Sequence, residues 1–177
     1  MQSLPPFKRV VTGHSEAGQA LAAFVGTTPQ VFSLKSVPGT IFHEVWNSCT
    51  APAQLDNGAD PTDKPLTLIP SPLGSVIRVV DIPPDSVQNA VSEKDAAAAL
   101  AEIGAVHAAT AKPDYKHKLM HRTEILDYGI VTVGEVQTMP GATVQRRWQG
   151  WSSSCSMANT HLNCWRFWNE IRNACRW

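Results

Sequence analysis

The sequence lacks the features that mark several large classes of protein. Fifteen Lys and Arg residues match fifteen Asp and Glu residues, so the 177-residue chain has no formal net charge. That balance argues against a nucleic-acid partner, because nucleic-acid-binding domains usually carry a basic excess. No apolar run approaches the roughly 18 residues of a membrane-spanning helix, and the first residues lack the basic and apolar regions of a secretion signal. We expect a soluble, cytoplasmic protein, with one main domain of about 100–200 residues.

Cysteine is also scarce, and no two cysteines form a Cys-x-x-Cys pair. The four are Cys49, Cys155, Cys164 and Cys175. In a chain without an export signal, this number and spacing do not predict a disulfide framework. A zinc site would need a tighter cluster of ligands. We therefore expect four reduced thiols.

The zero net charge conceals a change of composition at residue 146. Residues 146–177 contain five arginines and a single acid, Glu170, so they carry a net charge of +4 and the rest of the chain carries −4. They also contain five of the six tryptophans. Large apolar residues recur there about every three positions: Leu162, Trp165, Trp168, Ile171 and Cys175. The spacing predicts a C-terminal amphipathic helix of about 15 residues. We divide the chain into a β domain at 1–145 and an atypical tail at 146–177.

The β domain reads as short β-branched and aromatic segments separated by proline and glycine. The expected strands lie at residues 9–12, 20–25, 31–34, 40–46, 75–82 and 130–133. Five prolines between residues 51 and 73 exclude that stretch from a sheet interior. One helix is expected, with Ser92 as its N-cap and Gly104 just beyond its end. Many short strands with one inserted helix indicate an antiparallel barrel or sandwich.

Residues 120–129 hold the densest group of chemically useful side chains. On a strand, His121, Thr123 and Asp127 share one face, because side chains alternate with a period of two. An imidazole, a hydroxyl and a carboxylate on one face could bind a metal or transfer protons. His43 and Glu44 are different, because neighbours on a strand point to opposite faces and cannot share a site.

The same segment resembles the first motif of the cupin superfamily, which reads Gly, five residues, His-x-His, three or four residues, Glu, six residues, Gly. His121 falls on the first histidine, Thr123 on the second, Asp127 on the glutamate and Gly134 on the closing glycine. Further stretches are similar to small bacterial and fungal cupins of the kind found in polyketide gene clusters: residues 9–14, 38–46, 65–68 and 78–84. The resemblance implies a jelly-roll β-barrel with the site inside it.

For function, the resemblance implies a tailoring enzyme, an oxidoreductase, that acts on a small-molecule intermediate of secondary-metabolite biosynthesis. The residues implied as catalytic are His121, Asp127 and Tyr128. Thr123, Glu124 and Gln149 are implied as substrate contacts. His121 and Asp127 are also the implied ligands of a divalent metal, which would be iron, zinc or manganese. A homodimer is expected by analogy, because cupins often dimerise.

Two departures from the cupin pattern leave alternatives open. Thr123 replaces the second motif histidine, and Gln149 stands where a histidine of the second motif is expected; neither is a strong metal ligand. In addition, only four residues separate Glu135 from Pro140, where a hairpin of about 15 residues is expected from ordinary strand lengths. The alternatives are a metal-free binding barrel or cyclase/dehydratase-type barrel, and a degenerate cupin without catalysis. Residues 137–177 are then either a genuine folded end or a departure of the splice form or gene model.

Overall fold

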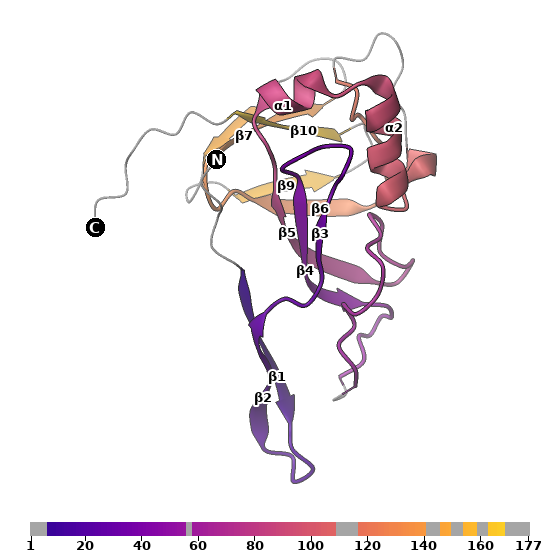
Figure 1. Cartoon of the computed structure of the whole chain (residues 1–177). Helices are drawn as coiled ribbons and strands as arrows, with labels where there is room; N and C mark the ends of the chain where they lie inside the picture. The colour runs from indigo at the N-terminus through magenta and orange to yellow at the C-terminus, as the bar shows by residue number, and fades with distance from the viewer. Residues whose placement is uncertain are drawn as a thin grey trace, which may run out of the picture. The chain divides into compact units, whose positions relative to one another are not determined.

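The computed structural model describes residues 7–55, 58–108, 117–140, 146–149, 154–158 and 163–168, with side chains up to residue 135. Within these residues the fold is mainly β, as predicted, with ten strands in four antiparallel sheets and two α-helices (Figure 1). The chain forms two compact units. The first comprises the chain up to Ser33 together with Ile41–Asp81, and the second comprises Leu34–Thr40 together with the chain from Ile82 onward.

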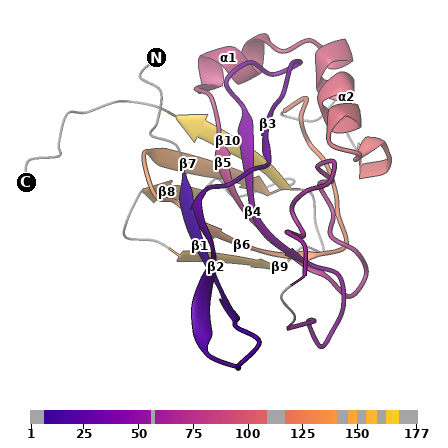
Figure 2. The same cartoon turned by 60° about the horizontal axis from the view of Figure 1, so that its bottom comes forward.

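The first unit contains a hairpin and a three-stranded sheet. Its strands are β1 (Lys8–His14), β2 (Ala20–Thr27), β3 (Val31–Ser33), β4 (Ile41–Ser48) and β5 (Ser75–Asp81). β1 pairs with β2, and the sheet order of the other three is β3-β4-β5 (Figure 2). All five strands confirm the sequence predictions to within a few residues. The described residues between β4 and β5 form no strand, as expected from their prolines, which cannot donate to a β-ladder.

β4 contains an irregularity that decides which of its side chains are buried. Glu44 pairs with Arg78 on β5, whereas Trp46 pairs with Ile77, so Val45 is an extra residue in the ladder. A β-bulge of this kind shifts the inward and outward alternation by one residue. Glu44 before the bulge and Asn47 after it are consequently both buried.

The second unit contains the helices, α1 (Asp85–Ala90) and α2 (Glu93–Glu102). The α2 prediction is confirmed: the Ser92 hydroxyl accepts a hydrogen bond from the Asp95 amide at 3.0 Å, and Gly104 adopts a φ of +66° just beyond the helix end. Apolar residues of this region form a buried core: Val91, Ala96, Ala99, Leu100, Ile103 and Ala105. α1 was not predicted, because its six residues follow Pro83-Pro84 without a recognisable apolar period.

Glu102 at the end of α2 binds the backbone of the segment that precedes β4. Its carboxylate accepts hydrogen bonds from the amides of Lys35 at 2.8 Å and Ser36 at 3.0 Å, and from the Ser36 hydroxyl. Although burial acts to raise the pKa of Glu102, these hydrogen bonds and the Lys35 charge lower it overall. The ionised carboxylate therefore holds residues 34–40 against the helix.

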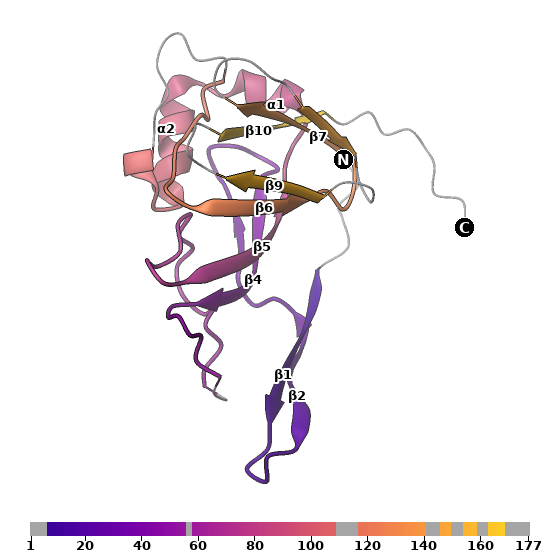
Figure 3. The same ribbon diagram turned by 180° about the vertical axis from the view of Figure 1, so that it is seen from behind.

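The remaining strands of the second unit form two small sheets. They are β6 (Leu126–Ile130), β7 (Glu135–Pro140), β8 (Arg146–Gln149), β9 (Ser154–Ala158) and β10 (Asn163–Trp168). β6 pairs with β9 (Figure 3). In the other sheet, β7 lies between β10 and β8. The predicted strand at 130–133 is misplaced, because β6 ends at Ile130 and the chain turns at Gly134, whose φ is +83°.

Two larger predictions are corrected. The described strands form four separate small sheets and do not close into a jelly-roll barrel. The C-terminal amphipathic helix is wrong over its described part, where residues 163–168 form β10 and pair with β7. Short aromatic stretches fit helical and strand periods about equally well, and pairing with a neighbouring strand decides between them. The boundary at 145/146 stays a prediction. No helix in the described residues has both the length and the apolar character needed to cross a bilayer.

Candidate functional site

The predicted site residues do not share one strand face. His121 forms an isolated β-bridge, the next four residues lie outside any strand, and β6 begins only at Leu126. The alternation that was expected to align His121, Thr123 and Asp127 therefore does not run through this segment, and that prediction is wrong. Asp127 and Tyr128 are neighbours on β6, so their side chains leave opposite faces of the strand. Tyr128 is 73 % exposed, whereas Asp127 is half-buried.

His121 nevertheless has a defined orientation. Its Nδ1 lies 3.0 Å from the carbonyl oxygen of Leu119. A carbonyl can only accept, so Nδ1 carries the hydrogen and Nε2 carries the lone pair. The ring is half-buried beside the buried residue Met120. His121 is thus held in the tautomer whose Nε2 can accept a proton.

The predicted substrate contacts differ in their exposure to solvent. Thr123 is buried, and Glu124 is exposed. Gln149 is the last residue of β8 and pairs through its backbone with Glu135 of β7; its side chain lies outside the described part of the structure. Cys175 lies outside the described residues altogether. Cys49 is a free, exposed thiol.

The divalent metal inferred from the cupin resemblance stays a prediction. His121 and Asp127 supply two ligands, and no group of three His, Cys, Asp or Glu side chains in the described ranges is arranged to hold a metal ion. Catalytic zinc sites use three protein ligands. We therefore derive no catalytic step through a metal.

A second group of ionisable residues, which the sequence did not reveal, lies in the β3-β4-β5 sheet. Glu44 on β4 is 3 % exposed and forms an ion pair with Arg78 on β5, with 3.0 Å between Arg78 Nε and Glu44 Oε1. Asn47, with its amide nitrogen turned toward the carboxylate, donates to Oε2 at 3.2 Å. Burial raises the pKa of Glu44, and the charges of Arg78 and Lys64 offset only part of that rise.

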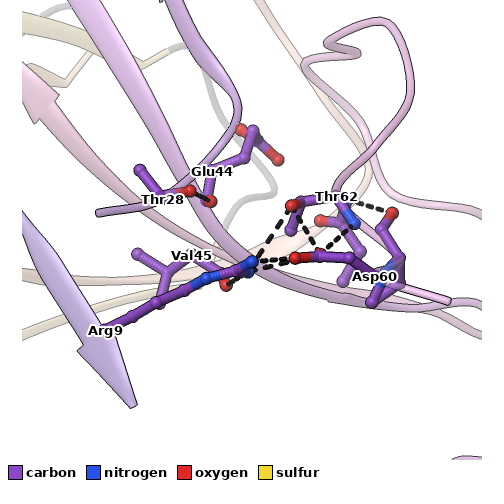
Figure 4. A network of polar contacts seen from close by, with 8 residues as sticks. Arg9, Thr28, Glu44, Val45, Asp60 and Thr62 are labelled. Atoms are coloured by element: carbon purple, nitrogen blue, oxygen red, sulfur yellow. Dashed lines mark hydrogen bonds and ion pairs between the residues drawn. The ribbon is translucent and has the colours of Figure 1, made fainter. Parts of the chain in front are cut away.

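The backbone around Glu44 is fixed by a buried arginine. Arg9 on β1 donates from Nη1 to the carbonyl of Val45, the bulged residue, at 2.8 Å (Figure 4). Its guanidinium also pairs with Asp60, and the Thr62 amide donates to the same carboxylate at 3.0 Å. On the other side, the Thr28 hydroxyl donates to the Glu44 carbonyl. The bulge is thus held by polar contacts where the ladder is interrupted.

The opposite face of the same sheet carries a histidine–aspartate pair. His43 Nε2 lies 3.0 Å from Asp81 Oδ2, and the two side chains are 14 % and 24 % exposed. The carboxylate orients the ring and can stabilise an imidazolium, as in general-base pairs. The prediction that His43 and Glu44 face opposite sides is confirmed by their different partners. The His43–Asp81 pair was missed because its register depends on the length of the loop between β4 and β5.

No model of a known protein family matches this chain, and no curated protein matches it at a significant level.

Proposed function

We propose that this protein is a cupin-like tailoring protein that binds a small organic molecule and transfers protons on it. The observation that carries the proposal is the His43–Asp81 pair, which is partly exposed and whose atoms lie 3.0 Å apart. Because the carboxylate accepts from Nε2, the neutral ring keeps a lone pair on Nδ1. A histidine oriented by a carboxylate in this way can act as a general base, which agrees with the cyclase- or dehydratase-type alternative.

The chemistry is a proton transfer without a further reactant. His43 Nδ1 would take a proton from a carbon next to a carbonyl group, and the electron pair of the C–H bond would move into the resulting enolate. Asp81 would stabilise the imidazolium through the Nε2–H bond. Return of the proton to the oxygen or to another carbon would complete an isomerisation and regenerate neutral His43.

Hydrogen–deuterium exchange tests this proposal. The full chain is incubated in deuterated buffer with small enolisable ketones, such as acetylacetone and 2-tetralone, and exchange is followed by NMR. We expect His43→Phe and Asp81→Asn to slow the catalysed exchange by about 10²-fold or more, the scale of general-base catalysis. His107→Phe is the matched control, because His107 is an exposed histidine of the other unit. Equal rates for all four proteins would overturn the proposal.

A metal-dependent oxidoreductase is the second candidate. The observation that favours it is the Nδ1 hydrogen bond of His121 to Leu119, since metal-binding histidines usually donate their other ring nitrogen to a carbonyl or carboxylate. The described residues do not complete a ligand set, so further ligands would have to come from elsewhere. Metal analysis of the purified protein tests it: stoichiometric iron, zinc or manganese that is lost in His121→Ala would favour this candidate.

A further inference from the structure

The sheet face that carries His43 is otherwise mainly apolar. Register places His43 on β4 between Val31 of β3 and Val79 of β5. Three further cross-strand pairs lie on the same face: Trp46 with Ile77, Ile41 with Asp81, and, at its end, Ser48 with Ser75, whose hydroxyls are 2.8 Å apart. Val31 is 49 % exposed and Ile77 is 61 % exposed. The His43–Asp81 pair is therefore bordered by aliphatic and aromatic side chains, and apolar side chains around a few polar groups are what small-molecule ligands contact in proteins.

The polar pair on this face offers a ligand a hydrogen-bond acceptor and a negative charge. Asp81 accepts the hydrogen of His43 Nε2, so neutral His43 offers Nδ1 as an acceptor. Arg78, the cation of β5, belongs to the opposite face, where it pairs with Glu44. The named residues of the His43 face include one carboxylate and no lysine or arginine. An anion would therefore meet a negative charge without a compensating cation.

We propose that this face binds an uncharged aromatic molecule that carries a hydroxyl group and donates its hydrogen to Nδ1 of His43. Trp46 and the aliphatic side chains would contact the ring, and aromatic pairs contribute beyond their buried area. The inference deepens the proposed function and rests on the same His43–Asp81 pair. It adds the chemical class of ligand, which the proton-transfer proposal leaves open.

Three naphthalene probes of similar size separate the effect of the hydrogen bond from the effect of the ligand's charge. They are 2-naphthol, which is an uncharged donor, 2-methoxynaphthalene, which is uncharged without a donor, and 2-naphthoate, which is an anion. Affinities for the full chain are measured by NMR titration in one mildly alkaline buffer. We expect 2-naphthol to bind about 5- to 10-fold more tightly than 2-methoxynaphthalene, the effect of one net hydrogen bond. 2-Naphthoate is expected to bind more weakly than both.

Variants assign the effect to the two residues. His43→Phe should abolish the preference for 2-naphthol over 2-methoxynaphthalene, whereas His107→Phe should retain it. Asp81→Asn keeps the size of the side chain and removes its charge, so it should narrow the gap between 2-naphthoate and 2-naphthol. This second variant tests the charge argument even if His43→Phe folds poorly. Equal binding of 2-naphthol and 2-methoxynaphthalene, or a preference that survives in folded His43→Phe, would overturn the inference.

The binding and exchange experiments can each reject one of the two proposals without rejecting the other. A protein that prefers 2-naphthol through His43 but catalyses no deuterium exchange has the inferred ligand class and lacks the proposed proton transfer. A protein that catalyses exchange through His43 but binds 2-naphthoate as tightly as 2-naphthol has the proposed chemistry and a different ligand class. A protein that shows neither the preference for 2-naphthol nor catalysed exchange would overturn both proposals.

Discussion

His117 and His121 hold opposite tautomers, because the Nδ1 atom of each contacts the backbone of Leu119. The Leu119 amide donates to His117 Nδ1 at 3.2 Å, and His121 Nδ1 donates to the Leu119 carbonyl at 3.0 Å. An amide can only donate and a carbonyl can only accept, so His117 carries its hydrogen on Nε2 and His121 carries it on Nδ1. The backbone of one residue thus assigns different proton-accepting atoms to two rings.

The first prediction concerns these tautomers. In neutral buffer, long-range ¹H–¹⁵N NMR spectra should show the Nε2–H form for His117 and the Nδ1–H form for His121. Leu119→Pro removes the amide donor and keeps the carbonyl, so it should release His117 while its effect on His121 is smaller. Spectra that show the same tautomer for both rings in the wild-type chain would contradict this geometry.

A second prediction concerns the pH dependence contributed by Glu44. Its folded-state pKa is raised, chiefly by burial, so the folded protein binds more protons than the unfolded protein at pH values above the unfolded pKa of about 4.5. The free energy of unfolding should therefore fall as the pH rises through this window. Glu44→Gln removes the titration, so the wild-type curve of unfolding free energy against pH should slope downward relative to that of the variant. Urea denaturation of the wild-type protein and of Glu44→Gln between about pH 4 and pH 7 gives the two curves. Parallel curves would contradict the raised pKa.

A third prediction concerns the buried guanidinium of Arg9. Arg9→Ala leaves Asp60 and the Val45 carbonyl without their partner, and breaking a buried ion pair costs about 3–5 kcal/mol. We expect the free energy of unfolding to fall by about that amount in denaturant titrations. Lys8→Ala is the control, since Lys8 is the exposed neighbour on β1 and its loss should change stability by about 0.5 kcal/mol or less. A similarly small effect of Arg9→Ala on the free energy of unfolding would show that the contacts of Arg9 do not stabilise the bulge.

A fourth prediction concerns Glu102 and the segment it holds. Its pKa is lowered overall, although burial opposes the change, so its contribution to stability is present above the unfolded pKa of about 4.5 and is lost as the pH falls through the lower folded value. Glu102→Gln should increase amide exchange at Lys35 and Ser36, whose N–H groups it binds. Glu93→Gln, in the first turn of the same helix, is the control. Unchanged exchange in Glu102→Gln would contradict the role of the carboxylate.

Local sequence features predicted much of the first unit and α2. Short aliphatic, β-branched and aromatic segments became β1 to β5, and Ser92 and Gly104 marked the ends of a helix that the structure confirms. These features act over a few residues and can be read without knowing the fold. The mainly β class followed from them.

The candidate site depended on longer-range information. His43 meets Asp81, and Glu44 meets Arg78, only because β4 and β5 pair in one register across a loop rich in proline. A shift by one residue would exchange the two faces. The bulge at Val45, which brings Asn47 to the side of Glu44, has no local signal in the sequence. Residues 163–168 likewise form β10 because they pair with β7. The apolar spacing of that segment predicted a helix and carries no information about this pairing.

The rate of deuterium exchange on 2-tetralone, compared between His43→Phe and His107→Phe, decides whether the His43–Asp81 pair transfers protons. We expect His107→Phe to retain the wild-type rate and His43→Phe to lose about 10²-fold or more of the catalysed exchange. Equal rates in the two variants, with both folded, would contradict the claim that the His43–Asp81 pair transfers protons on a small molecule.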